Sequence, residues 1–308
     1  MPQTRRSGAR RSGGGPGRSG GGPGRSGGGA GRSGGGGRRR SGGGSDLVGR
    51  VGIAVPGALV AIVFVDLGGI AWALLMIVLG SICLSELYRL LERWRPVSIV
   101  GFAALIGMCL VARSHGPGDV LEVAVAAVPV VFLGLVARGS GSGGATVAIA
   151  STLLGIYWIG FAFAHAVLLR EVPHGNGIII DVMVGTFLGD TAAYLGGRLF
   201  GRRPLAPEIS PKKTIEGLLC GMLAAVVGVF CAALYQPWLH HGTAFELGIA
   251  IAVLGPMGDL FESLVKRDAG AKDAGTIFGP HGGALDRLDA VMFTIVAAYY
   301  IWSAAPHP

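Results

Sequence analysis

The chain has 308 residues, of which 51% are hydrophobic and only 14% are charged, and its formal net charge is +8. A soluble domain carries about 25% charged residues, so this composition excludes an ordinary soluble protein and is typical of a polytopic membrane protein. The first 50 residues hold 11 of the 26 Lys and Arg residues. The positive net charge is therefore not a property of the whole chain, and we expect no nucleic-acid partner.

Residues 1–46 form a low-complexity tail in which the unit RSGGGPG starts at Arg11 and again at Arg18. This tail has almost nothing apolar to bury, so we expect it to be disordered. Because it contains no apolar core, it is not a cleaved signal peptide. It is either a solvated tail or a tether to anionic lipid, in which each Arg near the surface contributes about 1 kcal/mol.

From Val51 onward the sequence is a series of apolar segments. A membrane-spanning helix needs about 20 mostly apolar residues. Nine segments are candidates, at roughly 51–67, 69–87, 98–112, 119–137, 145–169, 177–197, 215–235, 244–264 and 286–304. We therefore predict an all-α polytopic membrane protein with about nine transmembrane helices. We divide it into N-terminal helices over 47–175 and a C-terminal catalytic region over 176–308.

The distribution of basic residues predicts the orientation of these helices. If the N-terminal tail is cytoplasmic, 24 of the 26 Lys and Arg residues lie on the cytoplasmic side, and only Arg113 and Arg170 lie opposite. Cytoplasmic loops of membrane proteins carry such an excess of Lys and Arg. We therefore predict a multi-pass protein of the inner cell membrane, N-in and C-out, with two long cytoplasmic loops at 198–214 and 265–285.

The first cytoplasmic loop leads into the sequence SPKKTIEG, residues 210–217. Ser followed by Pro predicts a helix start, with Ser210 as the cap and Pro211 in the first turn. With Lys212 and Lys213 beside it, this helix start is either an anion site or an ordinary cap with positive-inside lysines. Upstream, Asp190 lies within a predicted span, so we expect it to face a polar cavity or a cation, or to bond to a neighbouring helix.

The second loop and its flanking helices hold most of the remaining charge. Asp259, Ser263 and Lys266 share one face of a predicted helix, and Asp286 and Asp289 share a face of the next one. Such carboxylates are costly in an apolar chain unless they bind something. A few carboxylates plus phosphate oxygens are the ligands that Mg²⁺ prefers. The pattern therefore indicates a divalent ion and a polyphosphate held at a membrane surface.

The segment from Ser263 to Asp289, SLVKRDAGAKDAGTIFGPHGGALDRLD, resembles the signature of the phosphatidate cytidylyltransferases (CDP-diacylglycerol synthases). That signature is Ser-x-apolar-Lys-Arg, then Lys-Asp, then His-Gly-Gly-x-x-Asp-Arg-x-Asp. The likeness extends over residues 177–304, whereas residues 51–170 are similar only as apolar spans. The resemblance implies transfer of a cytidylyl group from CTP to phosphatidic acid in the membrane, a need for Mg²⁺ with K⁺ beside it, and a homodimer.

The resemblance also implies roles for individual residues. The catalytic residues are Ser263, Lys266, Asp286 and Asp289, and the metal is held by Asp259, Asp286 and Asp289. The substrate-binding residues are Ser210, Lys212, Lys213, Arg267, Lys272, His281 and Arg287. Which lysines contact CTP and which contact the lipid phosphate stays open, and so does the acyl-chain preference.

Two other functions compete with this interpretation. The first keeps the superfamily but changes the substrate, as in a CTP-dependent polyprenol or dolichol kinase or a cytidylyltransferase acting on another lipid phosphate. The second is a cation-coupled transporter whose intramembrane acids form an ion path. The transporter is disfavoured because the acids cluster at the predicted cytoplasmic edge.

Overall fold

The computed structural model describes residues 57, 59–139, 143–275, 277 and 282–306. The tail predicted over residues 1–46 lies outside these residues. The start of the first predicted span and His281 also lie outside them.

Every predicted segment from residue 69 onward is helical, with ends within four residues of those predicted. Residues 59–67 are helical as well. The helices are α2 (Gly69–Leu90), α3 (Ser98–Ser114), α4 (Pro117–Ala137), α5 (Ala145–Leu154), α6 (Phe161–Glu171), α7 (Gly175–Phe200), α8 (Ile215–Ala233), α9 (His241–Asp268) and α10 (Leu285–Ala304). A short 3₁₀-helix at Glu92–Trp94 follows α2, and a π-helical turn at Gly155–Gly160 joins α5 to α6.

Six of the described helical segments are long and apolar enough to cross a membrane, with α5, the π-helical turn and α6 forming one of them. The others are α2, α4, α7, α8 and α9, and α3 is a shorter apolar helix of 17 residues. The chain is thus a helical, multi-pass membrane protein. The full set of nine spans remains a prediction.

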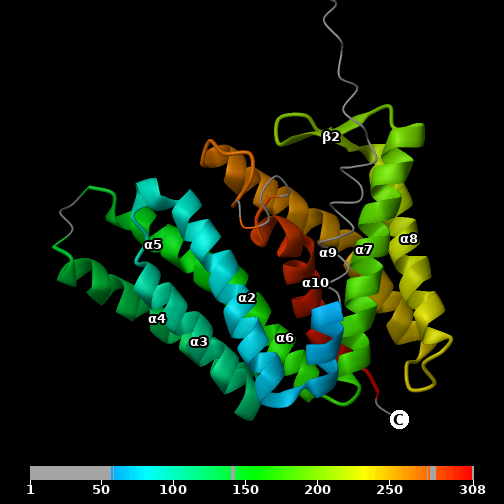
Figure 1. Cartoon of the computed structure of the whole chain (residues 1–308), viewed down its shortest axis with the longest axis horizontal. Helices are drawn as coiled ribbons and strands as arrows, with labels where there is room; N and C mark the ends of the chain where they lie inside the picture. The colour runs from blue at the N-terminus through cyan, green and yellow to red at the C-terminus, as the bar shows by residue number, and fades with distance from the viewer. Residues whose placement is uncertain (1–56, 58, 140–142, 276, 278–281, 307–308) are drawn as a thin grey trace, which may run out of the picture. The chain divides into compact units, whose positions relative to one another are not determined.

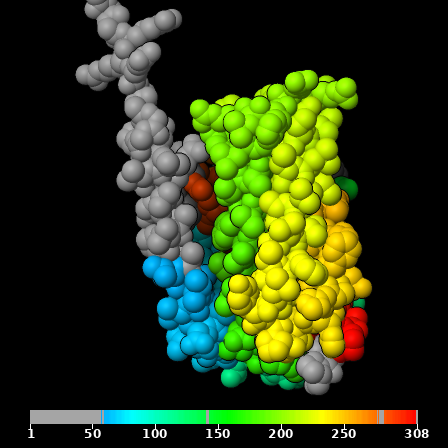
Figure 2. All heavy atoms as spheres, turned by 90° about the vertical axis from the view of Figure 1, so that its right-hand side faces the viewer, coloured from blue at the N-terminus to red at the C-terminus, as the bar shows by residue number. Residues whose placement is uncertain are grey.

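The helices pack as two groups that meet along a central row. Figure 1 shows α7, α8 and α9 on one side, α3, α4 and α5 on the other, and α2, α6 and α10 between them. In the view of Figure 2, α7 and α8 lie side by side along their length, with the loop that joins them above. This arrangement brings α9 and α10, which carry most of the predicted site, against the α7–α8 pair.

The loop between α7 and α8 forms a two-stranded antiparallel hairpin, with β1 (Pro204–Ala206) paired to β2 (Ser210–Thr214). The prediction that Ser210 and Pro211 begin a helix is therefore wrong. The helix begins at Ile215, and its cap is Thr214, whose hydroxyl accepts a hydrogen bond from the Gly217 backbone N–H at 3.1 Å.

The contacts of Glu216 explain why the backbone stays extended up to Thr214. Its carboxylate accepts hydrogen bonds from the backbone N–H groups of Arg202 and Arg203, at 3.0 and 3.2 Å. The Ile215 N–H donates to the Arg203 carbonyl. These bonds hold the end of α7 against the start of α8 and favour an antiparallel return over another helical turn. A proline is tolerated in a strand with only one paired edge.

Small residues allow α7 and α8 to approach closely. A Cβ atom added at Gly221 would lie 2.7 Å from the Gly189 carbonyl oxygen and 2.8 Å from the Ala193 Cβ. A Cβ at Gly217 would lie 2.6 Å from the Ala193 carbonyl oxygen. The two helices therefore pack backbone on backbone, as membrane helices with small residues at their interface do.

We expect Gly221→Ala to destabilise the protein and Gly107→Ala, in α3, to leave it unchanged or slightly more stable. Alanine favours a helix over glycine by about 1 kcal/mol, but at Gly221 the new methyl meets a fixed carbonyl, and such overpacking costs about 1–3 kcal/mol. At Gly107 the nearest side-chain atom, from Val123, is at an ordinary 3.4 Å. Thermal unfolding of both variants in detergent measures the effect, and equal shifts would contradict the packing argument.

Candidate active site

The ends of several helices and the hairpin meet at one end of the bundle (Figure 1). The Arg267 Nε at the end of α9 donates to the Ile209 carbonyl of the hairpin at 3.2 Å. The Leu285 N–H at the start of α10 donates to Glu86 of α2 at 2.9 Å. These bonds link segments far apart in the sequence, so this end of the bundle is one assembled surface.

Lys266 lies at the centre of this surface. Its Nζ is 2.5 Å from the Glu262 Oε2 of its own helix and 2.6 Å from the Asp286 Oδ1 of α10. The side chains of Lys266 and Glu262 are only 11% and 2% exposed. Because buried charges are costly unless they are paired, this three-residue ion pair fixes the end of α9 against the start of α10.

Asp286 also organises the loop between α9 and α10. Its Oδ2 accepts a hydrogen bond from the Gly283 backbone N–H at 2.7 Å, and the Ala274 N–H reaches both carboxylate oxygens at 3.0 and 3.2 Å. One carboxylate thus holds the two ends of the loop and Lys266. Asp286 was predicted as a catalytic residue and metal ligand, and its contacts here are with the loop and the lysine.

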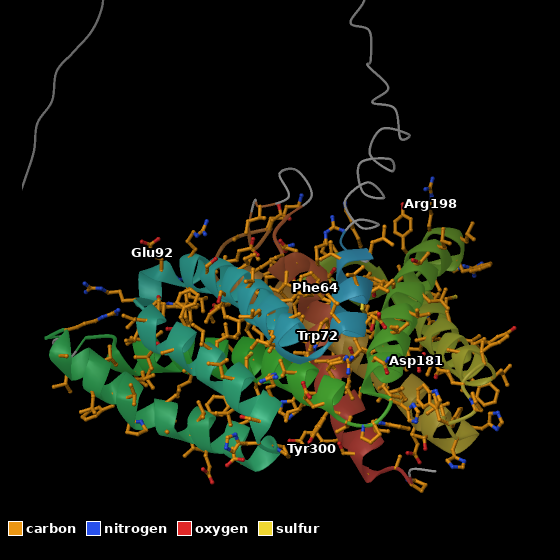
Figure 3. The ribbon with its side chains drawn as sticks, turned by 60° about the horizontal axis from the view of Figure 1, so that its bottom comes forward. Phe64, Trp72, Glu92, Asp181, Arg198 and Tyr300 are labelled. Atoms are coloured by element: carbon orange, nitrogen blue, oxygen red, sulfur yellow. The ribbon has the colours of Figure 1, made fainter. Side chains whose placement is uncertain are left out.

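A cavity of about 660 Å³ opens between the hairpin, α7 and α9. Its lining includes residues that the sequence singled out, namely Ser210, Lys212, Lys213, Asp259 and Asp190, together with Arg198 and Tyr194. Figure 3 shows Arg198 at the outer end of α7, whereas Asp181 lies toward its other end. The cavity therefore combines three cationic side chains with two carboxylates.

Asp259 connects this cavity to the ion pair around Lys266. Its carboxylate forms an ion pair with Lys213 of the hairpin and accepts a hydrogen bond from the Ser263 hydroxyl at 3.4 Å. Ser263 thus lies one helical turn beyond Asp259 on the same face of α9, as predicted. Lys266 lies on the following turn and pairs with the Glu262 and Asp286 carboxylates.

Asp289 is the most deeply placed of the predicted acids and is 7% exposed. The backbone of α10 at Asp289 packs directly against Gly258 of α9, where a Cβ would overlap the Asp289 carbonyl. Asp259 and Glu262 follow Gly258 by one and four residues on α9, and the Asp289 carboxylate interacts electrostatically with both. The contact between the two helices therefore brings acidic residues of α9 and α10 to the same region of the bundle.

The chemistry of this acidic cluster fits a cation, although the described residues contain no ready-made group of three metal-ligating side chains. Like charges crowded around a buried carboxylate repel one another, and a divalent ion held by oxygen ligands removes that repulsion. Asp259 is paired with Lys213, and Asp286 accepts bonds from Lys266 and two backbone N–H groups. The metal set predicted from Asp259, Asp286 and Asp289 therefore remains a prediction.

The remaining predicted substrate-binding residues lie around the same end of the bundle. Arg267 and Lys272 are exposed, and the Arg267 guanidinium also donates to the Ala271 carbonyl at 3.1 Å. Arg287 is exposed in the first turn of α10. His281 lies outside the described residues, so its predicted role is untested.

Two buried glutamates of this surface were missed by the sequence analysis. Glu262 escaped notice because it is one of several charges in the signature helix, although its spacing of four residues from Lys266 is a signal for an ion pair. Glu86 is 1% exposed and lies in α2, far from the signature in sequence. The available signal was a carboxylate inside an apolar span, which is a functional candidate by default.

Glu86 holds the loop between α9 and α10 against the N-terminal helices. Its Oε2 accepts the Leu285 N–H, and a Cβ on either Gly275 or Gly283 would overlap its carboxylate. Its Oε1 is buried and has no hydrogen-bond partner among the described residues. The two glycines therefore leave room for a carboxylate that enters from another helix.

Comparison with known proteins gives a consistent result. The sequence profile of the cytidylyltransferase family matches residues 48–305. A phosphatidate cytidylyltransferase of Bacillus subtilis is 30% identical over 274 residues, which cover 83% of this chain and 97% of that protein. The corresponding protein of Aquifex aeolicus is 41% identical over 156 residues, or 50% of this chain and 57% of that protein.

A phosphatidate cytidylyltransferase of Mycobacterium bovis is 28% identical over 213 residues, which cover 68% of this chain. The match spans 65% of the length of that mycobacterial protein. The alignment with this mycobacterial relative thus leaves about a third of that protein unmatched.

Proposed function

Because the chain belongs to the cytidylyltransferase family, we propose that it transfers the cytidylyl group of CTP to phosphatidic acid, giving CDP-diacylglycerol and pyrophosphate. One observation carries this proposal. The ion pair between Lys213 and Asp259 connects a cavity lined by cationic side chains to a cluster of carboxylates. A reaction between two anions at a membrane surface needs both features.

The residues of the cavity suit the reaction. An oxygen of the lipid phosphate attacks the α-phosphorus of CTP, a phosphorus–oxygen bond forms, and the bond to the β-phosphate breaks to release pyrophosphate. Since phosphatidate supplies its own nucleophilic oxygen, no covalent enzyme intermediate is required. Lys212, Lys213 and Arg198 line the cavity and would neutralise the approaching phosphates, and such positioning accounts for much of phosphoryl-transfer catalysis.

Lys266 has a second role in this scheme. It is held between the Glu262 and Asp286 carboxylates, so its ammonium group is positioned before any substrate arrives. A preorganised charge of this kind stabilises negative charge that develops in the transition state without further reorganisation. We assign Lys266 to the charge of the departing pyrophosphate, with Ser263 and Arg267 as further phosphate contacts.

Mg²⁺, with K⁺ beside it, completes the proposed site, held by Asp259 and Asp289 together with Asp286. When bound, the ions would neutralise phosphate charge and fix the alignment of the two reactants. Asp190 lines the same cavity as Asp259, so it would add to the negative field that attracts the ions.

The direct test is release of pyrophosphate from CTP by the purified full-length protein, with and without phosphatidate. We expect release only when both substrates and Mg²⁺ are present, with CDP-diacylglycerol as the lipid product. Equal or greater activity with a free polyprenol would favour a CTP-dependent lipid kinase instead. Activity with another lipid phosphate and none with phosphatidate would retain the family but overturn the substrate.

We place the site at the cytoplasmic face of the inner cell membrane, with the N-terminus inside. The support is the excess of Lys and Arg in the loops that meet at this end of the bundle. A cysteine at the exposed position Asp273 should be labelled by an impermeant reagent only from the cytoplasmic side, and one at exposed Glu171 only from the opposite side. These tests use a Cys231→Ala background, because Cys231 is exposed. The reverse pattern would contradict the orientation.

The resemblance to this family also leads us to propose a homodimer. The mass of the detergent-solubilised protein, measured by light scattering, distinguishes a dimer from a monomer.

We expect Glu86→Ala to lower kcat by about 10²-fold while the protein remains inserted in the membrane. The change frees the start of α10 by removing the acceptor of the Leu285 N–H, and a displacement of about 1 Å in a catalytic group costs about this much. Glu92→Ala, at an exposed position just beyond the same helix (Figure 3), is the matched control and should retain full activity. Equal activity of the two variants would remove Glu86 from the positioning of the loop.

A further inference from the structure

A second basic pocket is formed by N-terminal elements of the bundle, whereas the substrate cavity is formed by the hairpin, α7 and α9. Its volume is about 520 Å³, and it is formed by the segment after α2, the end of α4 and the start of α5. Its charged lining consists of Arg93, Arg95 and Arg138, and the described residues that line it include no carboxylate. Glu92, the acid next to it in sequence, is exposed and begins the 3₁₀-helix that follows α2 (Figure 3).

The local structure holds two of the three arginines, Arg93 and Arg138, in place. Arg93 lies over the Trp94 ring at 4.3 Å and donates to the Asp268 carbonyl at 2.5 Å. Arg138 donates to the Pro96 carbonyl at 3.1 Å. Because both guanidinium groups are bonded to neutral carbonyl oxygens, their charges are not balanced by a carboxylate at these contacts. An anion with several oxygens would supply that balance.

The rest of the lining distinguishes a lipid from a free phosphate. The lining also includes the apolar side chains of Leu135 in α4 and of Val147 and Ala148 in α5. Trp94 lines the pocket too and is half-buried, and tryptophan is enriched at the head-group level of membranes. Arginines next to apolar side chains suit a lipid that carries an anionic head group and acyl chains.

We propose that this pocket is a binding site for one anionic phospholipid, separate from the site of cytidylyl transfer. The residues that line it and those that line the 660 Å³ cavity form two sets with no member in common. Arg93 donates to the Asp268 carbonyl at the end of α9, so this region is bonded to the helix that carries Asp259 and Ser263. The bound lipid would thus lie beside the catalytic helix without entering the reaction.

The experiment counts the anionic lipids retained by the full-length protein. Purified protein in neutral detergent is titrated with phosphatidylglycerol in the presence of excess phosphatidylcholine, and bound lipid is measured by native mass spectrometry. The double variant Arg95→Gln, Arg138→Gln removes two charges of the pocket but leaves Arg93 and its bond to α9. We expect the concentration for half occupancy of one phosphatidylglycerol to rise at least about tenfold in this variant, because each basic residue near the lipid contributes about 1 kcal/mol.

Two controls separate the pocket from other basic regions. Arg89→Gln, an exposed position on α2 outside the lining, should leave the titration unchanged. Lys212→Gln, Lys213→Gln alters the substrate cavity and should also retain the lipid. Glycerol phosphate, which lacks acyl chains, should not displace it. The proposal is overturned if the arginine double variant binds as the wild type does, if Arg89→Gln weakens binding equally, or if glycerol phosphate competes at lipid concentrations.

Discussion

Lys266→Met is expected to lower turnover by at least about 10³-fold and to destabilise the folded protein. The loss of turnover follows from removing a positioned charge, since one such electrostatic contact contributes about 10²–10³ in kcat and Lys266 also holds Asp286. The loss of stability follows because the Glu262 and Asp286 carboxylates, 2% and 12% exposed, would lose their shared cation. Removing one partner of a buried ion pair costs about 3–5 kcal/mol.

A triple variant separates these two effects. Combining Lys266→Met with Glu262→Gln and Asp286→Asn removes the uncompensated carboxylates, so thermal stability in detergent should return toward that of the wild type. Turnover should stay lost, because no positioned ammonium group remains. If the single variant were as active as the wild type, Lys266 would have no part in the reaction. If the triple variant were no more stable than the single one, the ion pair would not explain the destabilisation.

The helices of this protein could be predicted from its sequence because a spanning segment is defined by length and apolarity alone. One contact within the candidate site was also predictable, because Asp259 and Ser263 are four residues apart in a predicted helix. Their hydrogen bond in α9 follows directly from that spacing. The sequence also indicated that Lys213 belongs to the candidate site, but it did not indicate that Asp259 is the partner of Lys213.

The features that escaped prediction depend on contacts between distant segments. The hairpin is stabilised by Glu216, which accepts hydrogen bonds from the Arg202 and Arg203 backbone. The helix-start preference of Ser-Pro depends only on neighbouring residues, so it does not predict a contact made across the loop. Glu86 contacts Leu285 across 199 residues. Such a pairing has no local periodicity, so only the folded chain relates α2 to the signature.

Asp289→Asn is expected to abolish turnover, by at least about 10³-fold, while the protein folds and inserts normally. The substitution preserves the shape of a side chain that is 7% exposed and that interacts with the Asp259, Glu262 and Asp190 carboxylates. A neutral amide adds no repulsion to these carboxylates, so the metal-free variant should be at least as stable as the metal-free wild type. The neutral amide is a poor ligand for Mg²⁺, so the cation that the reaction requires is no longer held.

Thermal unfolding with increasing Mg²⁺ tests the metal role independently of activity. The unfolding temperature of the wild type should rise with Mg²⁺, because a ligand that binds only the folded state stabilises it, whereas that of Asp289→Asn should stay flat. Asp268→Asn, at an exposed position at the end of α9, is the matched control and should respond as the wild type does. A variant that keeps the Mg²⁺ response but loses turnover would make Asp289 catalytic without being a metal ligand. Near-normal turnover of Asp289→Asn would exclude Asp289 from the site. It would also contradict the proposal that acidic residues of α9 and α10 bind a shared ion.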